Sequence, residues 1–159
     1  MSWRGSTDLK DRIFAALVYL LPWYYAFPFG QSLFEQFPIF TWLGVPLIPL
    51  APLFSIPFAD LIIFFVLYLA VVRNTRISHF IRYNTMQAIL LDIIVFLLGI
   101  VLEQLLKPIL GGNIIIQTLD NTIFLGTLIA CLYSIAQSAL GRYAEIPAIS
   151  EAAYTQVRY

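Results

Sequence analysis

The sequence predicts an all-α polytopic membrane protein with four transmembrane helices and a Pro-rich interfacial or re-entrant segment after the first. Of its 159 residues, 60% are hydrophobic and only 11% are charged, whereas soluble domains are about 25% charged. The apolar residues form four segments near the length of a membrane span, and the basic residues collect in alternate loops. We therefore expect a single membrane domain, 1–159, with spans near residues 13–29, 56–72, 85–106 and 122–140.

The first predicted span, 13–29, has about 17 residues and would be about 25 Å long. It can extend back to Leu9, and Asp8 or Thr7 is expected to cap its helix. Aromatic residues crowd its far end, which is typical of the interface between lipid and water. They are Trp23, Tyr24, Tyr25 and Phe27.

The segment of residues 30–57 is apolar but interrupted by prolines. Each proline removes a backbone donor and clashes with the preceding helical turn. Because unpaired backbone groups are costly in lipid, a continuous span is not expected here. The segment either lies on the membrane or re-enters it. The prolines are Pro38, Pro46, Pro49, Pro52 and Pro57.

The second predicted span, 56–72, begins beside Ser55, which we expect to be its N-cap. Pro57 is compatible with the first turn of a helix. Asp60 also falls in that turn, where the helix dipole favours a negative charge. We interpret Asp60 as a structural charge close to the membrane interface.

A turn at residues 111–113 separates the third predicted span from the fourth. Asp120 or Asn121 is expected to cap the fourth span, and Gly141 marks its end. Small residues recur at every fourth position of this span, which allows close packing against another helix, for example the third span. They are Gly126, Ala130, Ser134 and Ser138.

The basic residues predict the orientation of the protein, because short cytoplasmic loops are enriched in lysine and arginine. With four spans, eight of the nine basic residues lie on one side. Both termini are therefore expected on the cytoplasmic or stromal side. The exception is Lys107; the eight are Arg4, Lys10, Arg12, Arg73, Arg76, Arg82, Arg142 and Arg158.

The sequence offers no pattern that is typical of an enzyme. Cys131 is the single cysteine and His79 the single histidine, which we expect in a solvated loop. A metal site needs several such ligands at suitable spacing, so neither a metal nor another cofactor is expected. The formal net charge is zero, so nucleic acid is not an expected partner.

Polar residues in the third predicted span are the strongest functional candidates. A carboxylate near the centre of a spanning helix costs about 2.5–3.5 kcal/mol on insertion scales. At 100° per residue, the candidates other than Gln87 share roughly one face. They either line a translocation path or form interhelical polar contacts, with Asp92 protonated in the latter case. The candidates are Asn84, Gln87, Asp92 and Glu103.

The stretch of residues 82–93, RYNTMQAILLDI, carries a resemblance to a known family. Its Asn-x-x-Gln-Ala-x-x-Leu-Asp core resembles that of the twenty-kilodalton membrane subunit of the translocon at the inner envelope membrane of chloroplasts. The Pro-rich segment and the four-span plan extend the likeness over nearly the whole chain.

The resemblance implies a non-enzymatic subunit of a preprotein import complex that contributes to its channel. It also implies the lipid bilayer, other translocon subunits and preprotein substrates as partners. Because no cleavable transit peptide is recognised, a cyanobacterial membrane or a plastid inner envelope is the expected location. Four closely packed helices leave too little space to enclose a polypeptide, so a homo- or hetero-oligomer is expected.

Two other functions fit the same residues. A small-solute or amino-acid transporter or channel would use Asp92 in its path, so its removal would alter flux. A structural or assembly subunit of a larger membrane complex would instead change its partners when Asp92 is replaced.

Overall fold

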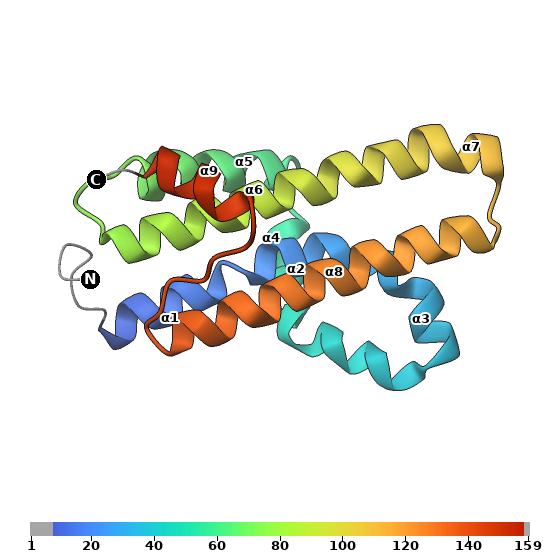
Figure 1. The fold of residues 1–159 in the computed structure, drawn as a ribbon, viewed down its shortest axis with the longest axis horizontal. Coiled ribbons are helices and arrows are strands. Elements are labelled where there is room, and N and C mark those ends of the chain that lie inside the picture. Colours follow the sequence, from blue (N-terminus) through green and yellow to red (C-terminus); the bar gives the residue numbers. More distant parts are fainter. Residues whose placement is uncertain (1–7, 158–159) are drawn as a thin grey trace.

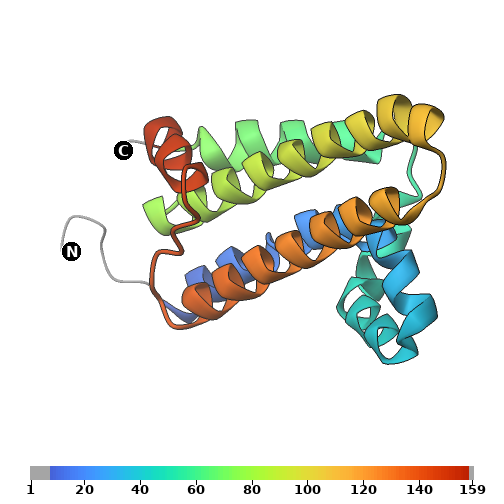
Figure 2. The same cartoon turned by 45° about the vertical axis from the view of Figure 1, so that its right-hand side comes forward.

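The computed structural model describes residues 8–157, and within this range the secondary structure is helical without any strand. Two long helices run antiparallel along the molecule, joined at one end by a short turn (Figures 1 and 2). They are α6, His79–Ile100, and α8, Ile114–Ala139. The all-helical fold class is as predicted.

The first apolar segment is helical and contacts both long helices. Leu9–Gln36 is long and apolar enough to cross a membrane. Asp8 is the N-cap, as predicted, and its carboxylate accepts from the backbone N–H of Asp11 at 2.8 Å. The helix is interrupted near Tyr19. Its parts are α1, Leu9–Leu17; α2, Leu20–Ala26; the 3₁₀ turn η2, Phe27–Gly30; and α3, Gln31–Gln36.

The proline-rich segment forms a 3₁₀ helix, η3, Pro38–Leu50, and the short helix α4, Ala51–Phe54. Together with α3 it projects from the bundle (Figure 2). Its outer face is apolar and exposed, which suits contact with lipid or with a partner. The exposed side chains include Phe37, Ile39, Trp42, Val45 and Ile48.

A bend of 98° separates this segment from the next helical pair. The pair is α5, Ala59–Val66, and the π-helical η4, Leu67–Val72. The N-cap prediction for Ser55 is wrong, because its hydroxyl donates to the carbonyl of Pro52 at the end of α4. Phe58 precedes α5 instead, with φ at 60°. The proline-rich run before α5 forms its own helical turns, so α5 begins later than predicted.

Both long helices begin earlier than the predicted spans. Ser78 caps α6, and Asn113 caps α8 by accepting from the backbone N–H groups of Ile115 and Ile116. The cap prediction of Asp120 or Asn121 is therefore wrong, since α8 already includes both residues. Beyond Ile100, α6 continues through the π-helical η5, Val101–Leu106, and α7, Lys107–Leu110.

The C-terminal part folds back onto the bundle. Helix α8 ends at Ala139, and Gly141 adopts φ of 77° just beyond it, as expected for a helix stop. The following segment leads to α9, Ile149–Gln156, which packs against α6 (Figure 1). Ala153 of α9 and Val157, just beyond its end, join a buried cluster with Tyr83.

By length and hydropathy, three helical segments of the described chain can cross a membrane, and four can if the bent pair counts as one span. The three are Leu9–Gln36, His79–Leu110 and Ile114–Ala139. The bent pair corresponds to the Pro-rich segment and the second predicted span. The part that matches the second predicted span, α5 and η4, contains 14 residues and is about 21 Å long, shorter than a ~30 Å hydrocarbon core.

Candidate functional site

A buried polar network lies where α6 meets the first helical segment and the C-terminal segment. Asn84 and Gln87 occupy its centre, on successive turns of α6, and both are fully buried. The break between α1 and α2 brings Tyr19 to the same point. A buried polar group must find hydrogen-bond partners to avoid a penalty of several kcal/mol, and these residues find them in one another.

Asn84 connects three helices through its side-chain amide. Its Oδ1 accepts from the Tyr19 hydroxyl at 2.6 Å and from the Ser138 hydroxyl of α8 at 3.3 Å. Its Nδ2 donates to the carbonyl of Phe80, one turn earlier in α6, at 2.9 Å. The amide therefore joins α6 to both the first helical segment and α8.

Gln87 connects α6 to the chain that follows α8. Its Nε2 donates to the Tyr19 hydroxyl at 2.8 Å and to the carbonyl of Ala144 at 3.1 Å. Its Oε1 accepts from the backbone N–H of Ile146 and from the Tyr83 hydroxyl, at 3.3 and 3.2 Å. Both amide hydrogens and two acceptor positions are thus in use.

Asp92 lies apart from this network and lines a cavity of about 360 Å³ between α6 and the α5–η4 pair. Its Oδ1 is buried and has no hydrogen-bond partner among the described residues. Asp60 and Tyr25 line the same cavity, whose other walls are apolar. Asp60 lies in the first turn of α5, as predicted, and shares this cavity with the mid-helix residue Asp92.

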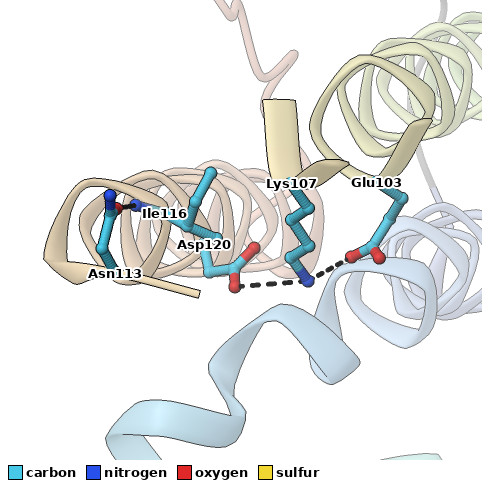
Figure 3. A network of polar contacts seen from close by, with 5 residues as sticks. All are labelled: Glu103, Lys107, Asn113, Ile116 and Asp120. Carbon is cyan, nitrogen blue, oxygen red and sulfur yellow. Dashed lines mark hydrogen bonds and ion pairs between the residues drawn. The ribbon is translucent and has the colours of Figure 1, made fainter. Parts of the chain in front are cut away.

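Glu103 belongs to a third environment, near the turn between α6 and α8 (Figure 3). The ammonium of Lys107 lies 2.6 Å from its carboxylate and 3.9 Å from that of Asp120 in α8. The Glu103 side chain is 49% exposed. Its position in η5, where the helix winds as a π-helix, separates it further from the face that carries Asp92.

The four polar residues predicted from the third span therefore lie in three separate places. Asn84 and Gln87 come together, whereas Asp92 and Glu103 each have other neighbours. The residues that the sequence did not indicate are Tyr19, Tyr83 and the backbone groups of Ala144 and Ile146. The Tyr19 hydroxyl, in an otherwise apolar run, was the one sequence signal for them.

The small-residue positions of α8 differ in their surroundings. Ser134 and Ser138 are buried, and Ala130 packs against the main core. Gly126 is exposed, and a Cβ placed there would have no neighbour within 4 Å. Helix α8 packs mainly against α1 and α2 rather than against α6.

His79 is not a solvated loop residue as predicted. It is the first residue of α6, and its Nδ1 lies 2.7 Å from the hydroxyl of Tyr143. Among residues 8–157, no group of three or more histidine, cysteine or acidic side chains could hold a metal ion.

Comparisons with known proteins agree on one family. The family model described as "Chloroplast import apparatus Tic20-like" matches residues 8–153, which include the whole buried network. A "Tic20 family protein" of Synechocystis sp. is 48% identical, over 100% of both chains. "Protein TIC 20-v, chloroplastic" of Arabidopsis thaliana is 36% identical, over 96% of this chain and 73% of its own. "Protein TIC 20, chloroplastic" of Pisum sativum is 27% identical over 92% of this chain and 58% of its own.

Proposed function

Since the chain belongs to the Tic20 family, we propose that it is a non-enzymatic membrane subunit of a protein-translocation complex that contributes to the path of the preprotein. The observation that carries this proposal is the family match over residues 8–153. The family model is described as a chloroplast import apparatus, and the chloroplast relatives carry the name TIC 20.

The buried network favours a structural role for Asn84 and Gln87 within that function. Both side chains are inaccessible in this conformation, so a passing polypeptide cannot contact them. They hold the first helical segment, α6 and the C-terminal segment at one point. We assign them to interhelical polar contacts that keep the bundle in shape, instead of to the surface of a path.

Asp92, a polar residue of the predicted stripe, lines the cavity between α6 and the α5–η4 pair. C-terminal to Asp92, helix α6 has exposed apolar side chains, for example Phe96 and Leu97. A large exposed apolar face in a membrane subunit suits lipid or a partner helix. We therefore place the path along the α5–α6 face, completed by other subunits or by a second copy.

Sidedness follows from the loop that joins η4 to α6. It contains Arg73 and Arg76, and the C-terminal helix α9 packs at the same end of α6. By the positive-inside rule this end faces the cytoplasm of a cyanobacterium or the stroma of a plastid. The proline-rich projection then lies toward the opposite side.

The test is purification of the tagged chain from its native membrane in a mild detergent, followed by mass spectrometry. Proteins of a secretory or import machinery, together with precursor chains, are the expected companions. Recovery of photosynthetic or respiratory subunits alone would contradict the proposal and favour an assembly role.

A small-solute transporter is the second candidate, favoured by the carboxylates of Asp60 and Asp92 that line one cavity. It predicts solute flux through liposomes that contain the chain alone. The Asp92→Asn variant would then alter flux while the protein still assembles in the membrane. The translocon function predicts no such flux from the isolated chain.

A further inference from the structure

The cavity between α5 and α6 has the features of a ligand site that the family match does not assign. Its volume of about 360 Å³ lies within the range of small-ligand sites, ~300–1,000 Å³. Its polar groups are few and converge from three elements: Tyr25 from α2, Asp60 from α5 and Asp92 from α6. The remaining walls are aliphatic and aromatic.

The positions of the two carboxylates along the helical hairpin follow from their places in its two arms. Asp60 precedes the end of η4, Val72, by 12 residues, and Asp92 follows the start of α6, His79, by 13. At 1.5 Å per residue both lie about 18–20 Å from the same end of the hairpin. They are therefore about level with each other along the hairpin.

The Asp92 carboxylate needs a partner that the described chain does not supply. Its Oδ1 is buried without a hydrogen bond. Among residues 8–157, no lysine, arginine or histidine lines the cavity, so neither carboxylate meets a positive charge there. A buried carboxylate oxygen without a partner is costly, and a cation that enters the cavity offsets that cost.

The cavity walls indicate which kind of cation fits. Ca²⁺ and Mg²⁺ take six or more oxygen ligands, and the described lining offers two carboxylates and one phenol. Rings of Tyr25, Phe64 and Phe96 line the same space. Aromatic faces attract organic cations, and apolar walls suit an alkyl stem.

From this arrangement we infer that the Asp60–Asp92 cavity binds an alkylammonium group, supplied by a lysine side chain of a polypeptide segment within the membrane. The cavity gives the methylene stem apolar contacts and gives the head group two carboxylates. The assignment of the cation to a lysine of a polypeptide rests on the proposed translocation function. The binding of an alkylammonium group to the cavity does not.

Binding is tested on the purified protein in an uncharged detergent, with n-octylammonium as the probe and octanol as the matched neutral probe. A ligand that binds only the folded state raises the thermal midpoint, here by about 2–4 °C for octylammonium and not for octanol. The Asp60→Asn/Asp92→Asn double variant should lose the shift. The Asp120→Asn variant should keep it, because Asp120 lies outside the cavity.

A second variant keeps the inference falsifiable if the double variant does not fold. Leu67→Trp fills the cavity without changing a charge, and it should also abolish the octylammonium shift. An equal shift with octanol or Mg²⁺, or a shift that persists in both variants, would overturn the site.

The source of the cation is tested in liposomes with a photoreactive residue at Leu61, which lines the cavity and is 55% exposed. An apolar membrane-spanning peptide with one central lysine should crosslink several-fold more than its norleucine analogue. Equal crosslinking would overturn the polypeptide source. Failure of this test leaves co-purification of translocation partners unaffected, so the two proposals fail separately.

Discussion

Tyr19 and Gln87, 68 residues apart in the chain, share a 2.8 Å hydrogen bond at the centre of the bundle. The same Tyr19 hydroxyl donates to Asn84 at 2.6 Å. One phenol therefore bridges two side chains on adjacent turns of α6. This bridge links the break in the first helical segment to the motif that identifies the family.

The Gln87→Ala substitution should destabilise the fold by about 2–4 kcal/mol, because it leaves several buried partners without their hydrogen bonds. The measurement is thermal unfolding in detergent micelles. Gln117→Ala is the matched control, since Gln117 is exposed on α8. Equal losses in the two variants would show that the buried network contributes nothing of its own.

The Tyr19→Phe substitution removes a single hydroxyl and keeps the ring in the core. We expect a loss of about 1–3 kcal/mol, because Asn84 and Gln87 each lose one buried partner. Tyr68→Phe is the control: Tyr68 is half-buried, and its hydroxyl has no hydrogen bond among the described residues. A double-mutant cycle of Tyr19→Phe with Gln87→Ala should give a coupling energy of at least about 0.5 kcal/mol.

The Gly30→Ala substitution should destabilise the contact between the first helical segment and α8. A Cβ at residue 30 would lie 2.7 Å from the ring of Phe34 and 3.0 Å from that of Phe124. Such overpacking costs about 1–3 kcal/mol. Gly126→Ala meets nothing within 4 Å and should leave the thermal midpoint of the isolated chain unchanged or slightly raised. A midpoint that falls as much for residue 126 as for residue 30 would contradict this.

The Glu103→Gln substitution should change stability by less than about 1 kcal/mol. The ion pair with Lys107 is short, but the Glu103 side chain is half exposed, and pairs of this kind contribute little after solvent screening. Comparing unfolding at low and high salt checks the reason. A large, salt-independent loss would show that the pair is shielded and structurally important.

The helices could be predicted from the sequence because their signals are local. Apolar runs, prolines and the Gly111–Asn113 turn mark most of the elements. The caps were harder: Asp8 was identified, whereas Ser78 and Asn113 extend α6 and α8 beyond the predicted spans. An apolar segment can continue helically into less apolar sequence, so hydropathy alone does not mark where a helix begins.

The functional candidates could be named from the sequence but not grouped. Helical periodicity put Asn84, Asp92 and Glu103 on one side of a helix, yet their neighbours come from three different parts of the chain. The cavity that Asp60 shares with Asp92 depends on the placement of α5 beside α6, which no local pattern predicts. Likewise, the backbone groups that Gln87 binds lie more than fifty residues away.

The most direct test of the account is photocrosslinking to a translocating precursor in native membrane vesicles. A photoreactive residue is placed at Phe96, on the α5–α6 cavity face, or at Ile129, on α8. The two side chains are similarly exposed, at 64% and 66%. We predict crosslinks to an arrested precursor from residue 96 and few from residue 129. Crosslinks to precursor from neither position, or equally from both, would contradict a translocation path along the α5–α6 face.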